Sequence, residues 1–293
     1  LGFYRNFERL LAIVPAEAEL VALSDHDDRW HPDKLAALRA SLGDAELAYS
    51  DLRLVDASGT VRAETFWEGR RNNYENLASL IVSNTVAGAA CLIRRRVAER
   101  ALPFPAGPGW DFHDHWLALV ALSMGRIAYV DRPLYDYVQH PGAVLGHVVS
   151  EAGEAPTPRA GLRDRLAASR GFLERWRRSY FTAYLQRKLQ ADVLDARCAD
   201  ELTARKRRAL RLMSRADRSP VAFGWLVSRP LRAAAGRNET LGVERLLARG
   251  IIWRHLMSAR KIWKRPGGPL GDASLPSYDS KSLGGSRRRW LAR

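Results

Sequence analysis

The stretch SDHDDRWHPDKL at residues 24–35 gives the first indication of a fold and of a site in this chain. A β-prone run ends at Leu23, and Pro32 favours the first turn of a helix that continues to about residue 42. Three carboxylates therefore come together between a strand and a helix: Asp25, Asp27 and Asp28. Carboxylates this close repel one another, and a hard divalent cation such as Mg²⁺ or Mn²⁺ relieves the repulsion through oxygen ligands. The simpler interpretation is that these aspartates only cap the following helix.

Strands and helices alternate outward from this stretch. Strands are predicted at residues 19–24, 46–50, 52–55, 60–62, 87–93, 126–130 and 133–138. Helices are predicted at residues 3–13, 32–42, 74–82 and 114–124. Because acidic residues fall at strand ends, the pattern predicts an open α/β sheet that binds ligands at its carboxyl edge.

The net charge of +15 is divided unevenly along the 293 residues. Residues 1–150 hold 15 Lys/Arg and 19 Asp/Glu, a net charge of −4, whereas residues 151–293 hold 32 and 13, a net charge of +19. We therefore predict a domain at 1–150, a basic and mainly α-helical region at 151–265, and a flexible tail or linker at 266–293. Helices in the basic region are predicted at about 161–213, 221–235 and 241–264.

The remaining composition limits the class of protein. A hydrophobic content of 46% is enough for a packed core. Two cysteines far apart in sequence, Cys91 and Cys198, argue against a disulfide framework or a cysteine-based zinc site and fit a reducing compartment. We see no signal peptide and no apolar run of about 18 residues, so we expect a cytoplasmic protein, at most peripheral at the inner face of the membrane.

Further motifs follow in order: NTVAGAACLIRR at 84–95, GWDFHDHWLALVALSMGRIAYVDRPLYDY at 109–137 and VQHPGAVLG at 138–146. Together with residues 24–35 they resemble family 2 glycosyltransferases, the inverting enzymes with a GT-A fold, and especially their bacterial rhamnosyltransferase-like branch. The resemblance covers about the first half of the chain. It implies a Rossmann-like GT-A domain that transfers a sugar from a nucleotide diphosphate to a hydroxyl acceptor in cell-surface polysaccharide synthesis.

The resemblance also predicts that the GT-A domain is incomplete. In this family an N-terminal βαβ portion holds most of the nucleotide base and ribose, but only 24 residues precede Asp25 here. We therefore expect an N-terminally truncated domain, and little or no activity from this fragment alone.

The resemblance assigns the metal and donor ligands. Asp27 is the first choice for direct metal ligation, and Asp25 either shares the metal or contacts the donor ribose. Asp28 is a further donor-binding candidate, since a D-x-D-D string allows more than one register. His140 falls where a family histidine reaches the diphosphate or the metal, although Val138 replaces an arginine that is common there.

Two other residues are placed near the donor. Asp51 is expected to orient the donor sugar, or alternatively to cap a turn. Lys34 is expected to be an exposed helix residue, with contact to a phosphate as the alternative.

Asp114, in the segment FHDHW at 112–116, is the predicted catalytic base. It matches the position of the family's acidic residue, and a helix start favours its ionised form. It would remove the acceptor proton as the hydroxyl attacks, which gives inversion in a single displacement. The alternative is an N-cap aspartate. Trp116 is expected to pack under the site.

The acceptor side is assigned to four residues: Asn84, Gly88, Trp110 and His113. Asn84 could instead end a helix, and Trp110 could be a core residue rather than a platform for a sugar ring or a lipid-linked carrier. Gly88 has no side chain, so it would allow another backbone segment to approach closely. His113 is expected to tune Asp114 or to lie in an exposed loop.

The basic half allows three interpretations. Its Arg/Lys clusters, including 205–208 and 287–289, could simply be solvated helix faces. They could attach the protein to an anionic membrane surface, or bind nucleic acid through phosphate neutralisation. No zinc finger, RNA-recognition motif or helix-turn-helix signature supports nucleic acid.

Our prediction is an inverting, metal-assisted glycosyltransferase that uses a nucleotide-sugar donor and a saccharide or lipid-linked saccharide acceptor. The alternatives are a metal-dependent phosphohydrolase that uses the same aspartates, and an inactive basic scaffold that binds an anionic membrane or nucleic acid.

Overall fold

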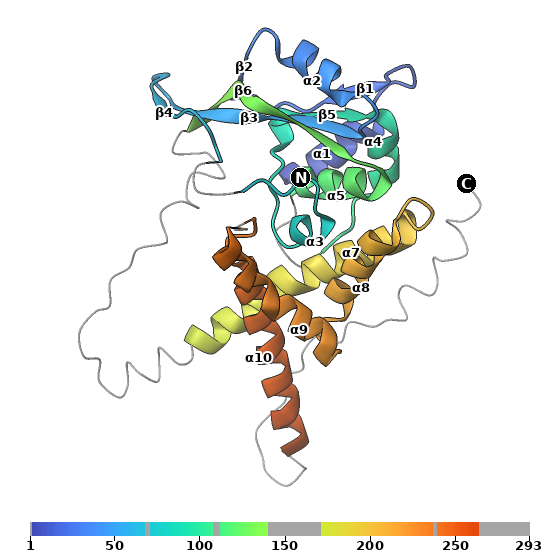
Figure 1. The fold of residues 1–293 in the computed structure, drawn as a ribbon, viewed down its shortest axis with the longest axis vertical. Helices are drawn as coiled ribbons and strands as arrows, with labels where there is room; N and C mark the ends of the chain where they lie inside the picture. The colour runs from blue at the N-terminus through green and yellow to red at the C-terminus, as the bar shows by residue number, and fades with distance from the viewer. Residues whose placement is uncertain (1, 68–70, 108–111, 140–170, 237–238, 264–293) are drawn as a thin grey trace. The chain divides into compact units, whose positions relative to one another are not determined.

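The structure is a computed structural model that describes residues 2–67, 71–107, 112–139, 171–236 and 239–263. Leu1–Leu256 form one compact unit and Met257–Arg293 a second. In the first unit a mixed α/β part is followed by a helical part (Figure 1). The predicted boundaries at 150 and 265 stay predictions, and the predicted tail lies almost wholly outside the described residues.

The sheet has six strands, in the order β1-β5-β3-β6-β2, with β4 paired to β3. The strands are β1 (Leu20–Ala22), β2 (Arg29–Trp30), β3 (Leu47–Asp56), β4 (Val61–Ala63), β5 (Cys91–Arg94) and β6 (Ile127–Gln139). Strands β3 and β6 are parallel, and every other pairing is antiparallel. It follows that β1, β3 and β6 run in the same direction and that their carboxyl ends face the same way.

Helices cover both faces of the sheet (Figure 1). In this part of the chain they are α1 (Phe3–Ala12), α2 (Lys34–Leu42), α3 (Leu77–Leu80), α4 (Arg95–Ala101) and α5 (His113–Met124), with the 3₁₀ turn η1 (Gly88–Ala90). Helix α2 lies on one face, and α1, α4 and α5 lie on the other.

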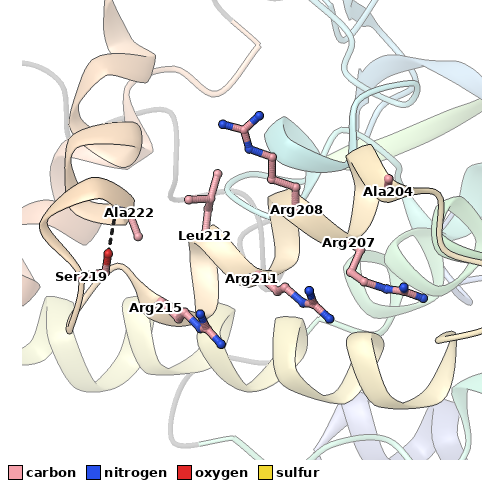
Figure 2. A pocket seen from close by; sticks show the side chains of 8 residues that line it. All are labelled: Ala204, Arg207, Arg208, Arg211, Leu212, Arg215, Ser219 and Ala222. Carbon is pink, nitrogen blue, oxygen red and sulfur yellow. Dashed lines mark hydrogen bonds between the residues drawn. The ribbon is translucent and has the colours of Figure 1, made fainter.

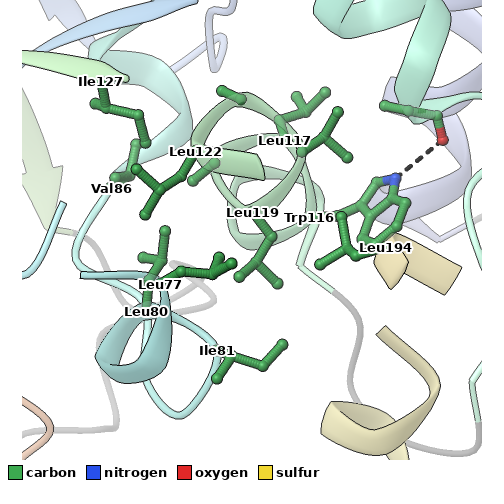
Figure 3. Packing of buried hydrophobic residues seen from close by; sticks show 14 of the residues in the cluster. Leu77, Leu80, Ile81, Val86, Trp116, Leu117, Leu119, Leu122, Ile127 and Leu194 are labelled. Carbon is green, nitrogen blue, oxygen red and sulfur yellow. Dashed lines mark hydrogen bonds between the residues drawn. The ribbon is translucent and has the colours of Figure 1, made fainter. Parts of the chain in front are cut away.

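The two faces follow from the two-residue period of the strands. Leu47 and Tyr49 of β3 join the larger core with α5, whereas Ala48 between them joins Leu38 and Leu42 of α2. Helix α5 is apolar on all sides and nearly all of it is buried, as expected for a central helix. Figure 3 shows its residues between α3 and the helical part of the chain, with Leu194 beside Trp116.

The helical part shares this core. It comprises residues 171–178, the π-helical segment η2 (Ser179–Tyr184), α7 (Leu185–Arg197), α8 (Ala204–Arg215), α9 (Pro220–Ser228), the 3₁₀ segment η3 (Arg229–Ala235) and α10 (Val243–Trp263). Tyr184, Leu194 and Leu210 belong to the same buried cluster as α5. Buried Arg229 also connects the two parts, since it donates a hydrogen bond to the Ser79 hydroxyl at 2.7 Å and contacts Glu244 at 3.3 Å.

Several predicted elements agree with the structure. The helices at 3–13, 32–42 and 114–124 are confirmed, and α2 ends at Gly43, whose φ is +45°. The hairpin is confirmed as β3 and β4, with Gly59 in its turn at φ +87°. In the basic region, α9 with η3 and α10 confirm the helices predicted at 221–235 and 241–264. Both cysteines are buried and free.

Five boundaries were predicted wrongly. The helix predicted at about 161–213 is interrupted at residues 198–203, between α7 and α8, and residues 161–170 of it lie outside the described residues. The strands at 46–50 and 52–55 are one strand, β3, and those at 126–130 and 133–138 are likewise one strand, β6. Pro133 sits at an irregularity in the β3–β6 register, which explains how the strand continues through a proline. The helix predicted at 74–82 is only the four-residue α3, and the strand predicted at 87–93 begins at Cys91, after η1.

No helix within the described residues is both long enough and apolar enough to cross a membrane.

Gly250 in α10 permits a close approach to the π-helical segment, because a Cβ there would lie 2.5 Å from the backbone nitrogen of Tyr180. We expect Gly250→Ala to lower the free energy of unfolding by about 1–3 kcal/mol, measured by urea denaturation. Gly224→Ala in α9 is the matched control, because a Cβ there meets nothing within 4 Å. It should be neutral, or stabilising by up to about 1 kcal/mol. Equal losses in the two variants would contradict this packing.

Candidate functional site

The acidic stretch lies at the carboxyl end of β1 and is held there by pairing with β6. Strand β2 places Arg29 opposite Asp136 and Trp30 opposite Tyr135. Asp136 accepts a hydrogen bond from Arg53 Nε at 2.8 Å, and its Oδ1 lies 3.0 Å from His31 Nε2. These contacts fix the stretch beside the carboxyl half of β6, an edge where α/β sheets commonly bind ligands.

Asp25, Asp27 and Asp28, named here the acidic cluster, are half-buried. Burial, and then the charge of Asp27, raises the pKa of Asp25. Burial, with the charges of Asp25 and Asp27, raises the pKa of Asp28 to about 7, although the Lys34 ammonium and the Val138 amide oppose this shift. Neither Asp28 oxygen has a well-formed hydrogen bond to the described part of the chain. Unpaired buried carboxylates are costly, so the cluster is suited to a cation.

The interpretation of these aspartates as helix caps is wrong. Helix α2 begins at Lys34 and Asp33 is its N-cap residue, so strand β2 separates the acidic cluster from the helix start. The cluster therefore has no part in the local backbone structure of α2.

The expectation that Lys34 is exposed is also wrong, because its side chain is fully buried. Its Nζ lies 3.6 Å from the centroid of the Trp30 ring and 4.8 Å from that of the Tyr135 ring, and it donates a hydrogen bond to the Ala89 carbonyl. Burial lowers the pKa of Lys34 to about 8, while Cys91 and the nearby aspartates act in the opposite direction. The Lys34 ammonium is thus a fixed counter-charge to the acidic cluster.

Asp114 lies in the first turn of α5 and is half-buried. Its Oδ1 accepts a hydrogen bond from the His115 backbone N–H at 2.6 Å. Burial raises the pKa of Asp114 to about 7, and the charge of Asp25 adds to this shift. Asp114 and the acidic cluster are therefore electrostatic neighbours although almost ninety residues separate them in sequence.

Tyr135 links these two groups. Burial raises its pKa well above the ordinary value, and the charges of Asp28, Asp25 and Asp114 contribute to the same shift. A buried phenol near all three carboxylates is a ready hydrogen-bond donor for a site of this charge.

His113 and Gly88 pack against each other beside Asp114. A Cβ at Gly88 would lie 2.6 Å from His113 Nε2 and 3.2 Å from Asp114 Cβ, so this position requires glycine. The close approach predicted at Gly88 is therefore made by a side chain rather than by backbone. The His113 ring stacks on Phe7 with centroids 3.6 Å apart, and burial lowers the pKa of His113 to about 3.

His113 is thus neutral and buried, not in an exposed loop, and neither ring nitrogen has a hydrogen-bond partner among the described residues. His115 is buried too, with Nε2 2.7 Å from the Leu80 carbonyl oxygen. Trp116 packs under the site as expected, fully buried, with Nε1 donating to the Ala101 carbonyl at 2.9 Å (Figure 3).

Asp51 is placed within β3 rather than at its end. Its carboxylate accepts hydrogen bonds from the backbone N–H groups of Leu52 at 2.7 Å and Phe66 at 3.1 Å, and from the Thr65 hydroxyl. These bonds anchor the segment after β4 to the sheet. The predicted contact of Asp51 with a donor sugar stays a prediction.

Asn84 closes a local turn. Its Nδ2 donates to the Val86 carbonyl at 2.8 Å, and its Oδ1 accepts from the Val86 N–H at 2.9 Å. The two predicted residues His140 and Trp110 lie outside the described residues.

The described residues contain no group of three or more His, Cys, Asp or Glu side chains arranged to hold a metal ion on their own. The donor chemistry nonetheless fits a hard cation, because Asp28 presents two buried oxygens without well-formed partners next to two further carboxylates. Mg²⁺ typically takes one or two protein carboxylates and completes its shell with water and substrate phosphates. The acidic cluster fits that mode of binding.

The sequence did not indicate that Tyr135 belongs to this site, and it indicated Lys34 only through the alternative of a contact to a phosphate. Nothing in the sequence indicates that the neighbours of Tyr135 are charged, because they come from residues 25–34 and from α5.

No protein-family model and no curated protein matches this chain. Among solved structures, the chain is similar to S. aureus TarS, residues 1–349, in complex with UDP-GlcNAc. The identity is 13% and the TM-score 0.33, over 88% of this chain and 72% of that chain. A similarity this low does not establish a shared fold, so the evidence for function comes from the site itself.

Proposed function

We propose that this protein is an inverting, metal-assisted glycosyltransferase of family 2 with a GT-A domain. The proposal rests on one observation, which is that the acidic cluster is an electrostatic neighbour of Asp114. The pKa of Asp114 is raised to about 7, and the charge of Asp25 contributes to that shift. A general base works best when its pKa lies near the operating pH. A separate group of carboxylates beside such a base suits a reaction in which a diphosphate leaves while a hydroxyl is deprotonated.

The residues of this chain divide the work of transfer. Asp25, Asp27 and Asp28 would hold a divalent cation, which supplies neutralisation of the departing diphosphate when bound. The Asp114 carboxylate accepts the proton of the acceptor hydroxyl. The hydroxyl oxygen then bonds to the anomeric carbon as the bond to the diphosphate breaks, and the configuration at that carbon inverts.

The buried groups hold this arrangement in place. The Lys34 ammonium interacts electrostatically with Asp25 and Asp28 and donates a hydrogen bond to the Ala89 carbonyl in η1, and Gly88 of η1 packs on His113 and Asp114. Lys34 and η1 therefore link the proposed metal ligands to the proposed base, an arrangement that suits preorganised charge stabilisation.

The finer assignments belong to this proposal. Donor contacts are assigned to Asp25, Asp28 and Asp51, with His140 reaching the metal or diphosphate. Acceptor contacts are assigned to four residues: Asn84, Gly88, Trp110 and His113. Since His113 is buried, we expect it to act by supporting Asp114. The acceptor is a saccharide or lipid-linked saccharide of cell-surface polysaccharide synthesis, as in the rhamnosyltransferase-like branch.

Turnover of a panel of UDP- and dTDP-sugars with Mn²⁺ or Mg²⁺, by this chain and by a version extended at its N-terminus, tests this function. The proposal predicts release of the intact nucleoside diphosphate and a sugar of inverted anomeric configuration, read by NMR. Release of inorganic phosphate would instead support a metal-dependent phosphohydrolase, and a retained configuration would contradict the single displacement.

Asp27→Ala should weaken Mn²⁺ binding by at least about tenfold, which corresponds to about 1.4 kcal/mol, because a charged oxygen ligand is lost. Electron paramagnetic resonance of free Mn²⁺ measures this without any substrate. Asp44→Ala is the control, since Asp44 is exposed and pairs with Arg126 away from the acidic cluster. Unchanged Mn²⁺ affinity in Asp27→Ala would remove this residue as a ligand.

A further inference from the structure

Helix α8 is unusually basic for its length. Of its twelve residues six are basic and none is acidic. The six are Arg205, Lys206, Arg207, Arg208, Arg211 and Arg215. The site proposed above uses none of them, and a folded domain does not need this density of one charge for stability, because like charges on one helix repel.

The helical period places the basic residues of α8 on different faces of the helix. One face packs against the rest of the unit, and the opposite face does not. Ala209, Leu210 and Met213 are buried against the rest of the unit, and Lys206 on the same side donates to the Gly125 carbonyl at 2.6 Å. On the opposite face Arg208, Arg211 and Arg215 follow at spacings of three and four residues and are all exposed.

The charges on this exposed face are poorly neutralised. Arg208 and Arg215 make no ion pair with a described carboxylate, and Arg211 reaches Asp195 only at 3.5 Å. A groove of about 400 Å³ runs along these arginines to Ser219 and Ala222 at the start of α9. Figure 2 shows the arginine side chains extending from α8 and the groove-lining residues of α9 beside them.

Helix α9 supplies a different kind of surface. It packs against α8, contains no charged residue, and anchors itself through buried Ala222 and Leu226. Val221, the chain neighbour of the groove-lining Ala222, is nevertheless 78% exposed, and Val227 is exposed as well. A valine this exposed gains nothing from the packing of the fold.

We propose that the α8–α9 surface, defined as Arg208, Arg211, Arg215 and Val221, docks the protein on a bilayer that contains anionic phospholipids. Guanidinium groups pair with phosphate oxygens in a bidentate manner. Uncharged apolar side chains beside them enter the headgroup region, the pattern of interfacial helices. This proposal does not depend on the transfer chemistry.

Nucleic acid is the competing partner for a basic face, and the apolar component argues against it. Single strands are held by aromatic stacking along a basic groove, and duplexes by polar contacts to phosphates and base edges. Val221 provides neither, whereas a lipid headgroup region accommodates an exposed valine.

The test is flotation of the full chain with vesicles of phosphatidylcholine, with and without about one third phosphatidylglycerol, at about 0.1 M salt. The variant combines Arg208→Gln, Arg211→Gln and Arg215→Gln. Three lost contacts should lower the partition coefficient on anionic vesicles about 100-fold. The matched control removes the same charge from exposed arginines elsewhere: Arg9→Gln, Arg39→Gln and Arg62→Gln. It should change partition no more than a few-fold.

Insertion of the Val221 position into the bilayer is measured in a separate experiment. A polarity-sensitive fluorophore on Val221→Cys should brighten on anionic vesicles, while the same label on Val61→Cys in β4 should not. The native thiols of Cys91 and Cys198 are buried and leave the label specific.

Three results would overturn the proposal. One is an equal loss of binding in the two triple variants. Another is equal binding of wild type to vesicles with and without anionic lipid. The third is binding to single- or double-stranded nucleic acid that is tighter than vesicle binding, with no response of the Val221 label to vesicles.

Discussion

Asp114→Asn should lower the rate of sugar transfer by about 10³-fold while Mn²⁺ affinity changes little. The amide keeps the shape of the side chain and its place at the start of α5, but it cannot accept the acceptor proton, and general-base catalysis contributes about 10²–10⁴-fold. Because burial raises the pKa of Asp114 to about 7, the wild-type rate should also rise as the pH passes through that value. The variant should lose this rise.

The readouts for Asp114→Asn are initial rates at saturating donor between about pH 5 and pH 9, with Mn²⁺ binding measured in parallel. His115→Asn is a useful comparison, since His115 contacts the Leu80 carbonyl and has no assigned role in proton transfer. An Asp114→Asn protein that retains the wild-type rate, or loses Mn²⁺ binding to the same extent as activity, would refute the assignment of Asp114 as the base.

Asp28→Asn should stabilise the metal-free protein at neutral pH. Its carboxyl is half-buried among like charges, and its pKa in the folded state is about 7 instead of 3.8. The folded state therefore holds a proton that the unfolded state has released between these two values. Wild-type stability falls as the pH rises from about 4 to about 7, and the cost is fully present above that. Allowing for partial exposure, we expect a gain on the order of 1–2 kcal/mol.

Urea denaturation in the presence of a chelator, at pH 4 and pH 8, measures the gain in Asp28→Asn. The two proteins should be equally stable at the lower pH and differ at the higher pH. Asp44→Asn should bring no such gain, because the hydrogen bond from Arg126 lowers the pKa of Asp44. A destabilised Asp28→Asn protein at pH 8 would mean that the Asp28 carboxylate is a structural partner rather than an ion-binding group.

The sequence predicted well those elements whose boundaries depend on local chemistry. Helix α2 lies between Pro32 and Gly43, and α5 has a continuous apolar pattern that ends at Gly125. The prediction failed at β6, because Pro133 suggests that the strand breaks there. The strand continues because its pairing with β3 has a register irregularity at Pro133. The length of β6 therefore depends on its pairing with β3 rather than on its own sequence.

The acidic residues of the candidate site were predicted together with Gly88 and His113, whereas Tyr135 and the burial of Lys34 were not. Lys34 resembles any charged helix residue in sequence, and its burial depends on Trp30, Tyr135 and the Ala89 carbonyl. His113 was predicted to tune Asp114 or to lie in an exposed loop, and its burial depends on Phe7 and Gly88, which pack against its ring. Such environments are assembled from segments far apart in sequence, and no local pattern specifies them.

Calorimetric titration of UDP and of dTDP into this chain, with Mn²⁺ and then with a chelator, tests the central claim most directly. The proposal predicts nucleotide binding that requires the metal and that Asp27→Ala weakens by at least about tenfold, as it weakens Mn²⁺ binding. Nucleotide binding that is the same with the chelator, or no metal-dependent binding of either nucleotide to this chain or to a version extended at its N-terminus, would contradict the claim that the acidic cluster holds a cation for a nucleotide diphosphate.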